Sequence, residues 1–183
     1  PYAGYNRRYE NGKILNASAS MNYGFLNNDL QGNFNIWHRY NPFNLGEIAI
    51  SGGRSYESIN RNDAYLNQLR PSNYIQLDAG RLRHLIEITN GLFISNEIDY
   101  SVLKPITGLR TSSFLQNLVE DNEEPQEFEP YEAFRTTSII TFTPGLKYMR
   151  EPDRKIRLGS KWPTFRLLYR KGWKGQFSSD IDF

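Results

Sequence analysis

Charged residues recur at every second position in several segments of this sequence. In an extended strand, that spacing places their side chains on one side of the chain. Acidic and basic members alternate between neighbouring segments, so we expect them to form ion pairs on the water-facing side of a β-sheet. Structural neutralisation of partly buried charge is the expected role, and a filter for permeating ions is the alternative. The predicted network consists of Arg81, Arg83, Glu87, Glu97, Asp99, Arg166 and Arg170.

Residue types suited to catalysis are sparse. The two histidines, His38 and His84, fall among the apolar positions of alternating segments, where packing is the expected role. The sequence has no Gly-x-Ser-x-Gly motif, no phosphate-binding loop and no histidine spacing typical of zinc. A lipid-modifying enzyme would need a Ser–His pair, for which His84 is the only candidate. We therefore expect no catalytic residues, no cofactor and no metal site.

Two charged segments could bind ions. The acidic run could hold calcium, but it lacks the order of ligands in known calcium loops, and we expect a solvated loop. Its acidic residues are Glu120, Asp121, Glu123, Glu124, Glu127 and Glu129. The basic run could contact phosphates, but no aromatic stacking pattern accompanies it, so we expect no nucleic-acid partner. Its basic residues are Arg154, Lys155, Arg157 and Lys161.

The elements that must position these residues are strands. From Lys13 to Asn27 apolar residues alternate with small or polar ones almost without interruption, which is typical of a strand with one apolar face. Similar alternation follows near 30–40, 45–56, 77–88, 92–101, 136–149 and 164–171, and 175–183 resembles the start of another strand. The residues expected to face lipid are Leu15, Ala17, Ala19, Met21, Tyr23, Phe34, Ile36, Ile94, Ile98, Phe142, Phe165 and Leu167.

The connections between these segments differ in length in a regular order. Short turns are expected near 41–44, where Asn-Pro stands, and near 89–91, where Asn-Gly favours a tight hairpin. Long connections are expected near 57–73, which could include a helical turn capped by Asn62 or Asp63, and near 102–134. Bacterial outer-membrane barrels combine short periplasmic turns with long extracellular loops. We therefore place the long connections outside the cell, and the short turns, with 151–163, in the periplasm.

The apolar face could belong to a membrane barrel or to a soluble β-sheet. No apolar run is long enough for a transmembrane helix, and the mean hydropathy of −0.65 is typical of soluble proteins. However, several expected strands exceed the five or six residues typical of soluble sheets, and aromatic residues stand near their ends. The chain has 183 residues, a net charge of +2 and no cysteine, which excludes disulfides. We predict an all-β, antiparallel, up-and-down transmembrane barrel segment of seven or eight strands, part of a larger barrel.

Several short motifs resemble a family of Bacteroidota outer-membrane proteins that combine an N-terminal carboxypeptidase-regulatory-like domain with a C-terminal barrel. The resemblance covers the whole chain but only the barrel part of the family. It implies a location and an architecture, and it implies no peptidase activity, because the domain of that name is not catalytic. The motifs are Tyr40–Phe43, Gly52–Arg54, Thr89–Leu92, the spaced set Tyr148, Pro152 and Lys155, the run Gly159–Phe165, and Tyr169–Gly172.

These observations lead to one expected function and two alternatives. We expect residues 1–183 to be part of a single outer-membrane barrel domain with a non-enzymatic role in envelope assembly, export or surface complexes. The expected partners are outer-membrane lipid and other outer-membrane proteins, such as barrel-assembly or export machinery. The alternatives are a soluble β-rich binding or adhesion domain and a lipid-modifying enzyme. The turn expected to brace or plug the periplasmic mouth contains Gly159, Ser160, Lys161, Trp162 and Pro163.

Overall fold

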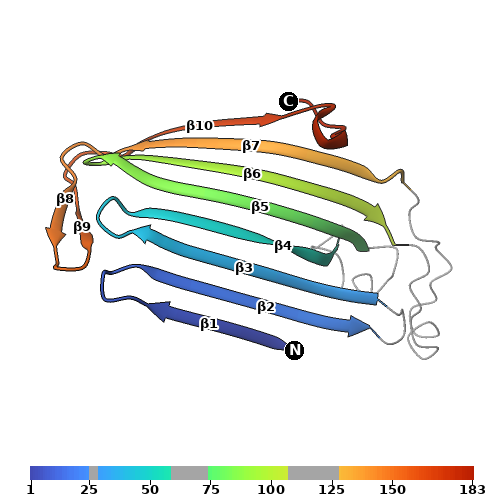
Figure 1. The fold of residues 1–183 in the computed structure, drawn as a ribbon. Helices are drawn as coiled ribbons and strands as arrows, with labels where there is room; N and C mark the ends of the chain where they lie inside the picture. Colours follow the sequence, from blue (N-terminus) through green and yellow to red (C-terminus); the bar gives the residue numbers. More distant parts are fainter. Residues whose placement is uncertain (25–28, 59–73, 107–127) are drawn as a thin grey trace, which may run out of the picture.

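A computed structural model describes residues 1–24, 29–58, 74–106 and 128–183. The fold is all-β, as predicted, and eight of its strands form one antiparallel up-and-down sheet in the order β1-β2-β3-β4-β5-β6-β7-β10 (Figure 1). The strands of this sheet are β1 Tyr2–Arg8, β2 Ile14–Gly24, β3 Asp29–Asn41, β4 Gly46–Ser58, β5 Tyr74–Thr89, β6 Leu92–Pro105, β7 Tyr131–Phe142 and β10 Phe165–Gly172. In the described part of the chain, β1 and β10 do not pair with each other, so the sheet is open.

A separate hairpin lies at one end of the sheet. It consists of β8 Lys147–Arg150 and β9 Lys155–Gly159, which pair only with each other. The hairpin connects β7 to β10 and projects beside the short turns (Figure 1). We call this end of the sheet the turn end and the opposite end, where the β4–β5 and β6–β7 connections begin, the loop end.

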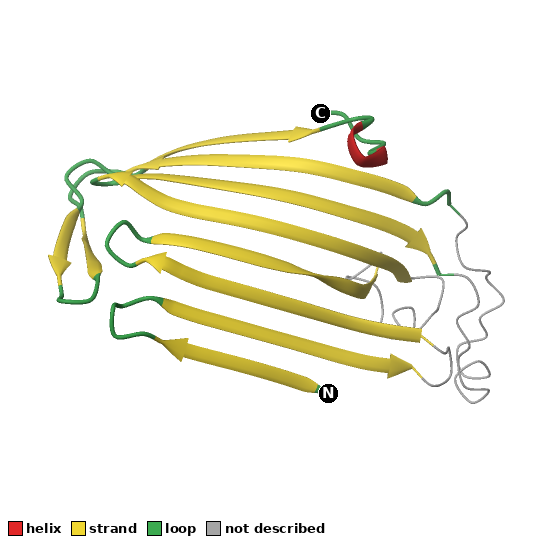
Figure 2. Ribbon diagram, viewed as in Figure 1, coloured by secondary structure: helices red, strands yellow, loops and turns green. Residues whose placement is uncertain are grey.

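The sheet is a single layer (Figure 2). Among the described residues, the buried hydrophobic side chains are Leu45, Phe93, Ile106 and Ala133, which is a very small core for eight strands. The described residues contain no helix that is long and apolar enough to cross a membrane. The sheet therefore leaves most of its apolar side chains without a covering layer of protein.

The β3–β4 and β5–β6 turns form at the positions that the sequence predicts. The side-chain oxygen of Asn41 accepts hydrogen bonds from the backbone N–H groups of Phe43 (3.1 Å) and Asn44 (3.0 Å), which closes the β3–β4 turn. Gly91 has a φ of 78° in the β5–β6 turn, a conformation that Asn-Gly sequences favour. Both predicted short turns are thus confirmed. Strands extend into both predicted long connections, since β4 reaches Ser58 and β6 reaches Pro105. Residues 59–73, which include Asn62 and Asp63, lie outside the described part of the chain.

The structure corrects three strand predictions. β1 was missed, because its apolar residues alternate too weakly to stand out. The single strand expected across 136–149 ends at Phe142, because Pro144 cannot donate to a ladder and Gly145, at φ 60°, turns the chain into the hairpin. The strand expected at 175–183 is instead a 3₁₀ turn, Gln176–Ser178, followed by an extended segment.

The segment after β10 folds back over β7. Ser179 accepts a hydrogen bond from the backbone N–H of Phe134 (3.1 Å), and Asp180 accepts one from that of Glu132 (3.0 Å). The backbone N–H of Asp180 in turn donates to the carbonyl of Glu132 (2.9 Å). The segment therefore satisfies the backbone of β7 beyond the point where β10 ends.

Candidate functional site

Cross-strand register places every residue predicted to contact lipid on the same side of the sheet, which we call the apolar face. The row Ala17, Ile36, Ile50, Leu82, Ile98 consists of direct neighbours from β2 to β6. These side chains are exposed to a similar degree, from 38% for Leu82 to 44% for Ile50 among the four large ones. On this face lie Leu15, Ala17, Ala19, Met21, Tyr23, Phe34, Ile36, Ile94, Ile98, Phe142, Phe165 and Leu167.

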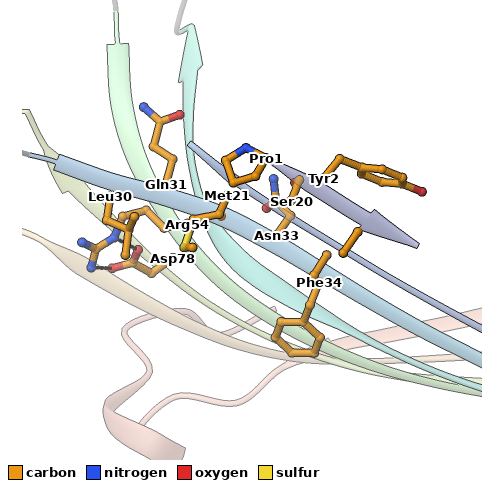
Figure 3. Close-up of a pocket in the computed structure, with 13 residues that line it drawn as sticks. Pro1, Tyr2, Ser20, Met21, Leu30, Gln31, Asn33, Phe34, Arg54 and Asp78 are labelled. Atoms are coloured by element: carbon orange, nitrogen blue, oxygen red, sulfur yellow. Dashed lines mark hydrogen bonds and ion pairs between the residues drawn. The ribbon is translucent and has the colours of Figure 1, made fainter. Parts of the chain in front are cut away.

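Charged residues limit the apolar face toward the loop end. Arg54 on β4 forms two hydrogen bonds with Asp78 on β5, at 2.7 and 3.2 Å. Lys104 on β6 reaches the same carboxylate at 3.2 Å. Beside this cluster lies an apolar hollow of about 620 Å³, lined by residues such as Met21, Leu30 and Phe34 (Figure 3). On β4, β5 and β6 these charges therefore interrupt the apolar surface before the strands end.

Polar side chains inside the apolar face are paired. The hydroxyl of Tyr40 lies 2.6 Å from Nε2 of His84, and the two rings stack with centroids 5.8 Å apart. Ser138 donates to the side-chain oxygen of Asn96 at 2.9 Å. Among the described residues, no serine bonds to His84, so the pair required for the enzyme hypothesis is not assembled there.

The opposite side, which we call the polar face, carries the predicted charge network only in part. Arg81 lies 3.5 Å from Glu97 and 3.6 Å from Asp99. Arg135 on β7 forms the closest contact with Asp99, whose side chain is 9% exposed. The sequence prediction did not include Arg135. This residue stands at an odd position of β7, whereas the apolar Ile140 and Phe142 stand at even positions, so the alternation places it on the polar face.

The remaining members of the predicted network lie elsewhere. Glu87 is near the turn end and pairs with the hairpin. Within the described part of the chain, Arg83, Arg166 and Arg170 form no ion pair, although their positions in the register put them on the polar face. Structural neutralisation therefore accounts for Arg81, Glu97 and Asp99 but not for these three arginines.

Glu87 is the point where the hairpin is fixed to the sheet. Its side chain is 2% exposed, and its Oε2 lies 2.6 Å from Nζ of Lys155. Its Oε1 accepts hydrogen bonds from the hydroxyl of Tyr148 and from the backbone N–H of Gly91 (2.9 Å). Lys155 also lies over the ring of Tyr148, 3.6 Å from its centroid. Lys155 thus neutralises the buried carboxylate of Glu87, and Tyr148 and Gly91 supply its remaining hydrogen bonds.

The hairpin also reaches the turns of more distant strands. Asp153 at its tip forms an ion pair with Arg8 on β1 at 3.4 Å. The backbone N–H of Lys155 donates to the carbonyl of Pro42 in the β3–β4 turn, at 3.4 Å. The hairpin therefore spans the turn end from β7 to β1 along the polar face.

The motif from Gly159 to Pro163 guides the chain from the hairpin into β10. The hydroxyl of Ser160 donates to the carbonyl of Pro144 and accepts from the backbone N–H of Trp162 at 3.0 Å. Trp162 is 66% exposed, and Lys161 and Pro163 are also exposed, so none of the three is buried against the sheet. The motif braces the turn end, and the part that crosses it is the β8–β9 hairpin.

The basic residues of this region do not gather into one phosphate site. Arg154 pairs with Glu151 at 2.5 Å, and this hydrogen bond raises the pKa of the Arg154 guanidinium, while Lys155 pairs with Glu87. Arg157 lies over the ring of Phe93, 5.1 Å from its centroid. Lys161 is exposed. Three of the four cations thus have separate partners within the protein, so the geometry favours bracing over phosphate binding.

The sequence of the chain matches one known protein family. A family model described as the C-terminal domain of a family of unknown function, DUF5686, matches residues 1–183. The chain belongs to this family. Searches of curated proteins and of solved structures found no match. The family description names neither a membrane nor a bacterial phylum, so both remain predictions for this DUF5686 domain.

The polar face of the DUF5686 domain also contains two adjoining hollows, of about 370 and 310 Å³. Residues from β3, β4 and β5 line both, and Asn35, Ser51 and Arg81 are shared between them. No group of three or more potential metal ligands occurs among the described residues. Of the acidic residues weighed as calcium ligands and expected to form a solvated loop, only Glu129 is described, since Glu120, Asp121, Glu123, Glu124 and Glu127 lie outside the described part.

Proposed function

We propose that this chain forms part of the wall of a bacterial outer-membrane β-barrel, in a protein of the Bacteroidota envelope. The observation that carries the proposal is the apolar face, which continues across eight strands without a covering layer in the described part of the chain. Water-soluble proteins rarely expose apolar patches of this extent. Lipid is the solvent in which such a face is stable.

The height of the apolar face agrees with a membrane. Between Asp78 and Ile88, β5 advances by about 33 Å at about 3.3 Å per residue. At the strand tilt of about 40° typical of membrane barrels, this length projects to about 25 Å, the usual height of their apolar band. The Arg54–Asp78–Lys104 cluster then lies at the outer interface.

The pairing of polar groups on the apolar face supports the same environment. Hydrocarbon offers no hydrogen bonds, so a polar side chain facing it must find a partner on the protein. Tyr40 with His84 and Asn96 with Ser138 satisfy this requirement. A water-facing sheet would not need such pairs.

The role that we propose is structural or accessory, in envelope assembly, export or surface complexes, with outer-membrane lipid and other outer-membrane proteins as partners. A wall segment with a hairpin across its turn end suits a barrel whose periplasmic mouth is restricted. Arg8–Asp153 and Glu87–Lys155 hold that hairpin at two separate strands. No specific contact among the described residues favours an adhesion domain or a lipid-modifying enzyme over this role.

The full-length natural protein tests the proposal. We expect it to fractionate with outer membranes, to require detergent for extraction and to migrate differently on gels before and after boiling. Recovery as a soluble monomer without detergent would overturn the proposal. Lipid turnover that disappears in a His84→Ala variant would replace it with the enzyme hypothesis.

A further inference from the structure

The centre of the polar face is a trough with a narrow floor and two different walls. Its floor is formed by Ala49 and Ser51 on β4, whose side chains are small. One wall carries Asn35 and Trp37 on β3, and the other carries Arg81 and Arg83 on β5. We propose that this trough binds a small acidic sugar, that is, a monosaccharide carrying a carboxylate.

Strand register explains the trough. Trp37, Ala49 and Arg83 are direct cross-strand neighbours, and so are Asn35, Ser51 and Arg81. Neighbouring strands lie about 4.8 Å apart, so the backbones of the two walls are separated by about 10 Å. The hollow between them has a volume of about 370 Å³, which is at the small end of the range for ligand sites. One sugar ring fits this width.

The trough has a net positive charge, because Arg81 and Arg83 outnumber the one carboxylate of its lining, Glu97, and an anion matches this charge. Arg83 is exposed and forms no ion pair among the described residues, and Arg81 contacts its two carboxylates only at 3.5 and 3.6 Å. Arg135 forms the close contact with Asp99, which leaves Arg81 less strongly neutralised. A guanidinium group binds a carboxylate through two parallel hydrogen bonds.

The hydrogen-bond acceptors of the trough call for hydroxyl groups on the same ligand. Asn16 lines the hollow, and its Oδ1 is buried without a hydrogen-bond partner in the described part of the chain. A buried acceptor without a partner is costly, and a donor supplied by a ligand removes that cost once the amide turns toward it. Glu97 supplies a second acceptor on the opposite side.

Trp37 gives the ligand an apolar surface in a fixed position. Its indole N–H donates to Glu47 at 3.2 Å, and Arg39, which pairs with the same carboxylate, lies 5.3 Å from the ring centroid. The ring is therefore held in place before a ligand arrives. A carboxylate, several hydroxyls and one apolar ring face occur together in an acidic sugar. A simple carboxylate lacks the hydroxyls, and a neutral sugar lacks the charge.

Calorimetric titration of the full-length protein in detergent with glucuronate tests the inference. We expect saturable binding of glucuronate, and no measurable binding of acetate or glucose at the same concentrations. Arg83→Gln is expected to weaken binding by at least about tenfold, because it removes a charge-assisted interaction. Arg170→Gln is the matched control, since Arg170 lies on the same face but outside the trough, and it is expected to bind as the wild type does.

A second variant separates ligand contact from loss of charge. Ala49→Leu fills the floor without changing any charge, and we expect it to abolish binding while the sheet still folds, as judged by far-UV circular dichroism. Equal binding by wild type and Arg83→Gln, or binding of acetate as tight as that of glucuronate, would overturn the inference. So would the absence of glucuronate binding. None of these results depends on whether the apolar face contacts lipid, so the proposed function is tested separately.

Discussion

Nζ of Lys155 lies 2.6 Å from Oε2 of Glu87, and this ion pair joins two residues that are 68 positions apart in the sequence. It is the most buried ion pair in the described part of the chain, with side chains 18% and 2% exposed. Breaking a buried pair from one side leaves a charge without a partner, which costs more than the pair itself contributes. The contact therefore holds the hairpin against the sheet.

Lys155→Met tests this contact. We expect the variant to lose about 3 kcal/mol of hairpin docking free energy, because Glu87 stays buried without its cation. Limited trypsin digestion, read by mass spectrometry, should then cut the hairpin much faster than in the wild type. Lys147→Met is the control, because Lys147 is exposed on the same hairpin. Equal cleavage of the two variants would contradict the prediction.

Ionisation of the Tyr148 hydroxyl sets an upper pH limit for docking of the hairpin. Burial, together with its hydrogen bond to Glu87, raises the pKa of the Tyr148 hydroxyl to about 12. The pKa is higher in the docked state than in the free one, so the stabilisation is complete below about pH 10. It is lost as the pH rises through about 12. The difference in phenolate absorbance between wild type and Tyr148→Phe should show a late transition near pH 12, and a transition near pH 10 would contradict this assignment.

Gly12 is required where the hairpin tip meets the β1–β2 turn. Its φ is 75°, and a Cβ atom there would lie 1.8 Å from the carbonyl oxygen of Asp153. Gly12→Ala must therefore displace the tip, and we expect a loss of more than about 1 kcal/mol and faster trypsin cleavage after Arg154. Gly80→Ala is the control, because a Cβ there meets no atom within 4 Å. Unchanged cleavage in Gly12→Ala would show that the tip does not rest on this turn.

The two faces of the sheet are distinguished by labelling. The sequence has no cysteine, so a single cysteine can be introduced at either of two consecutive residues whose side chains lie on opposite faces. If the apolar face contacts lipid, a water-soluble maleimide should label Asn35→Cys much faster than Ile36→Cys in isolated outer membranes. After denaturation both should label equally. Rapid labelling of Ile36→Cys in the membrane would show that water reaches the apolar face.

The sequence predicted the faces well because alternation is a local property. Residues two apart in a strand share a face whatever their partners are, so the apolar set from Leu15 to Leu167 needed no knowledge of the tertiary structure. The Asn-Gly turn was predictable for the same reason, since it depends on backbone conformation at Asn90 and Gly91.

The sites were less predictable, because they depend on contacts between distant residues. The seven charges were expected in one network, but Glu87 pairs with Lys155 on the hairpin, and Arg135 takes the place next to Asp99. The hairpin itself was hidden, because β8 continues the apolar alternation of β7 and only the Pro144-Gly145 pair marks the break. The missed strand β1 alternates weakly, and its pairing with β2 defines it instead.

Arg135 provides a test of the polar face. It forms the closest contact with Asp99, whose side chain is 9% exposed, whereas Arg81 is 3.6 Å away. Arg135→Leu should therefore leave a partly buried carboxylate with only a weak partner and lower the free energy of unfolding by about 2 kcal/mol. Arg166→Leu removes the same charge from an exposed position on the same face and should cost less than about 0.5 kcal/mol. Denaturant titration in detergent measures both. A smaller loss for Arg135→Leu than for Arg166→Leu would mean that Asp99 relies on Arg81, and that Arg81 is not available to the trough.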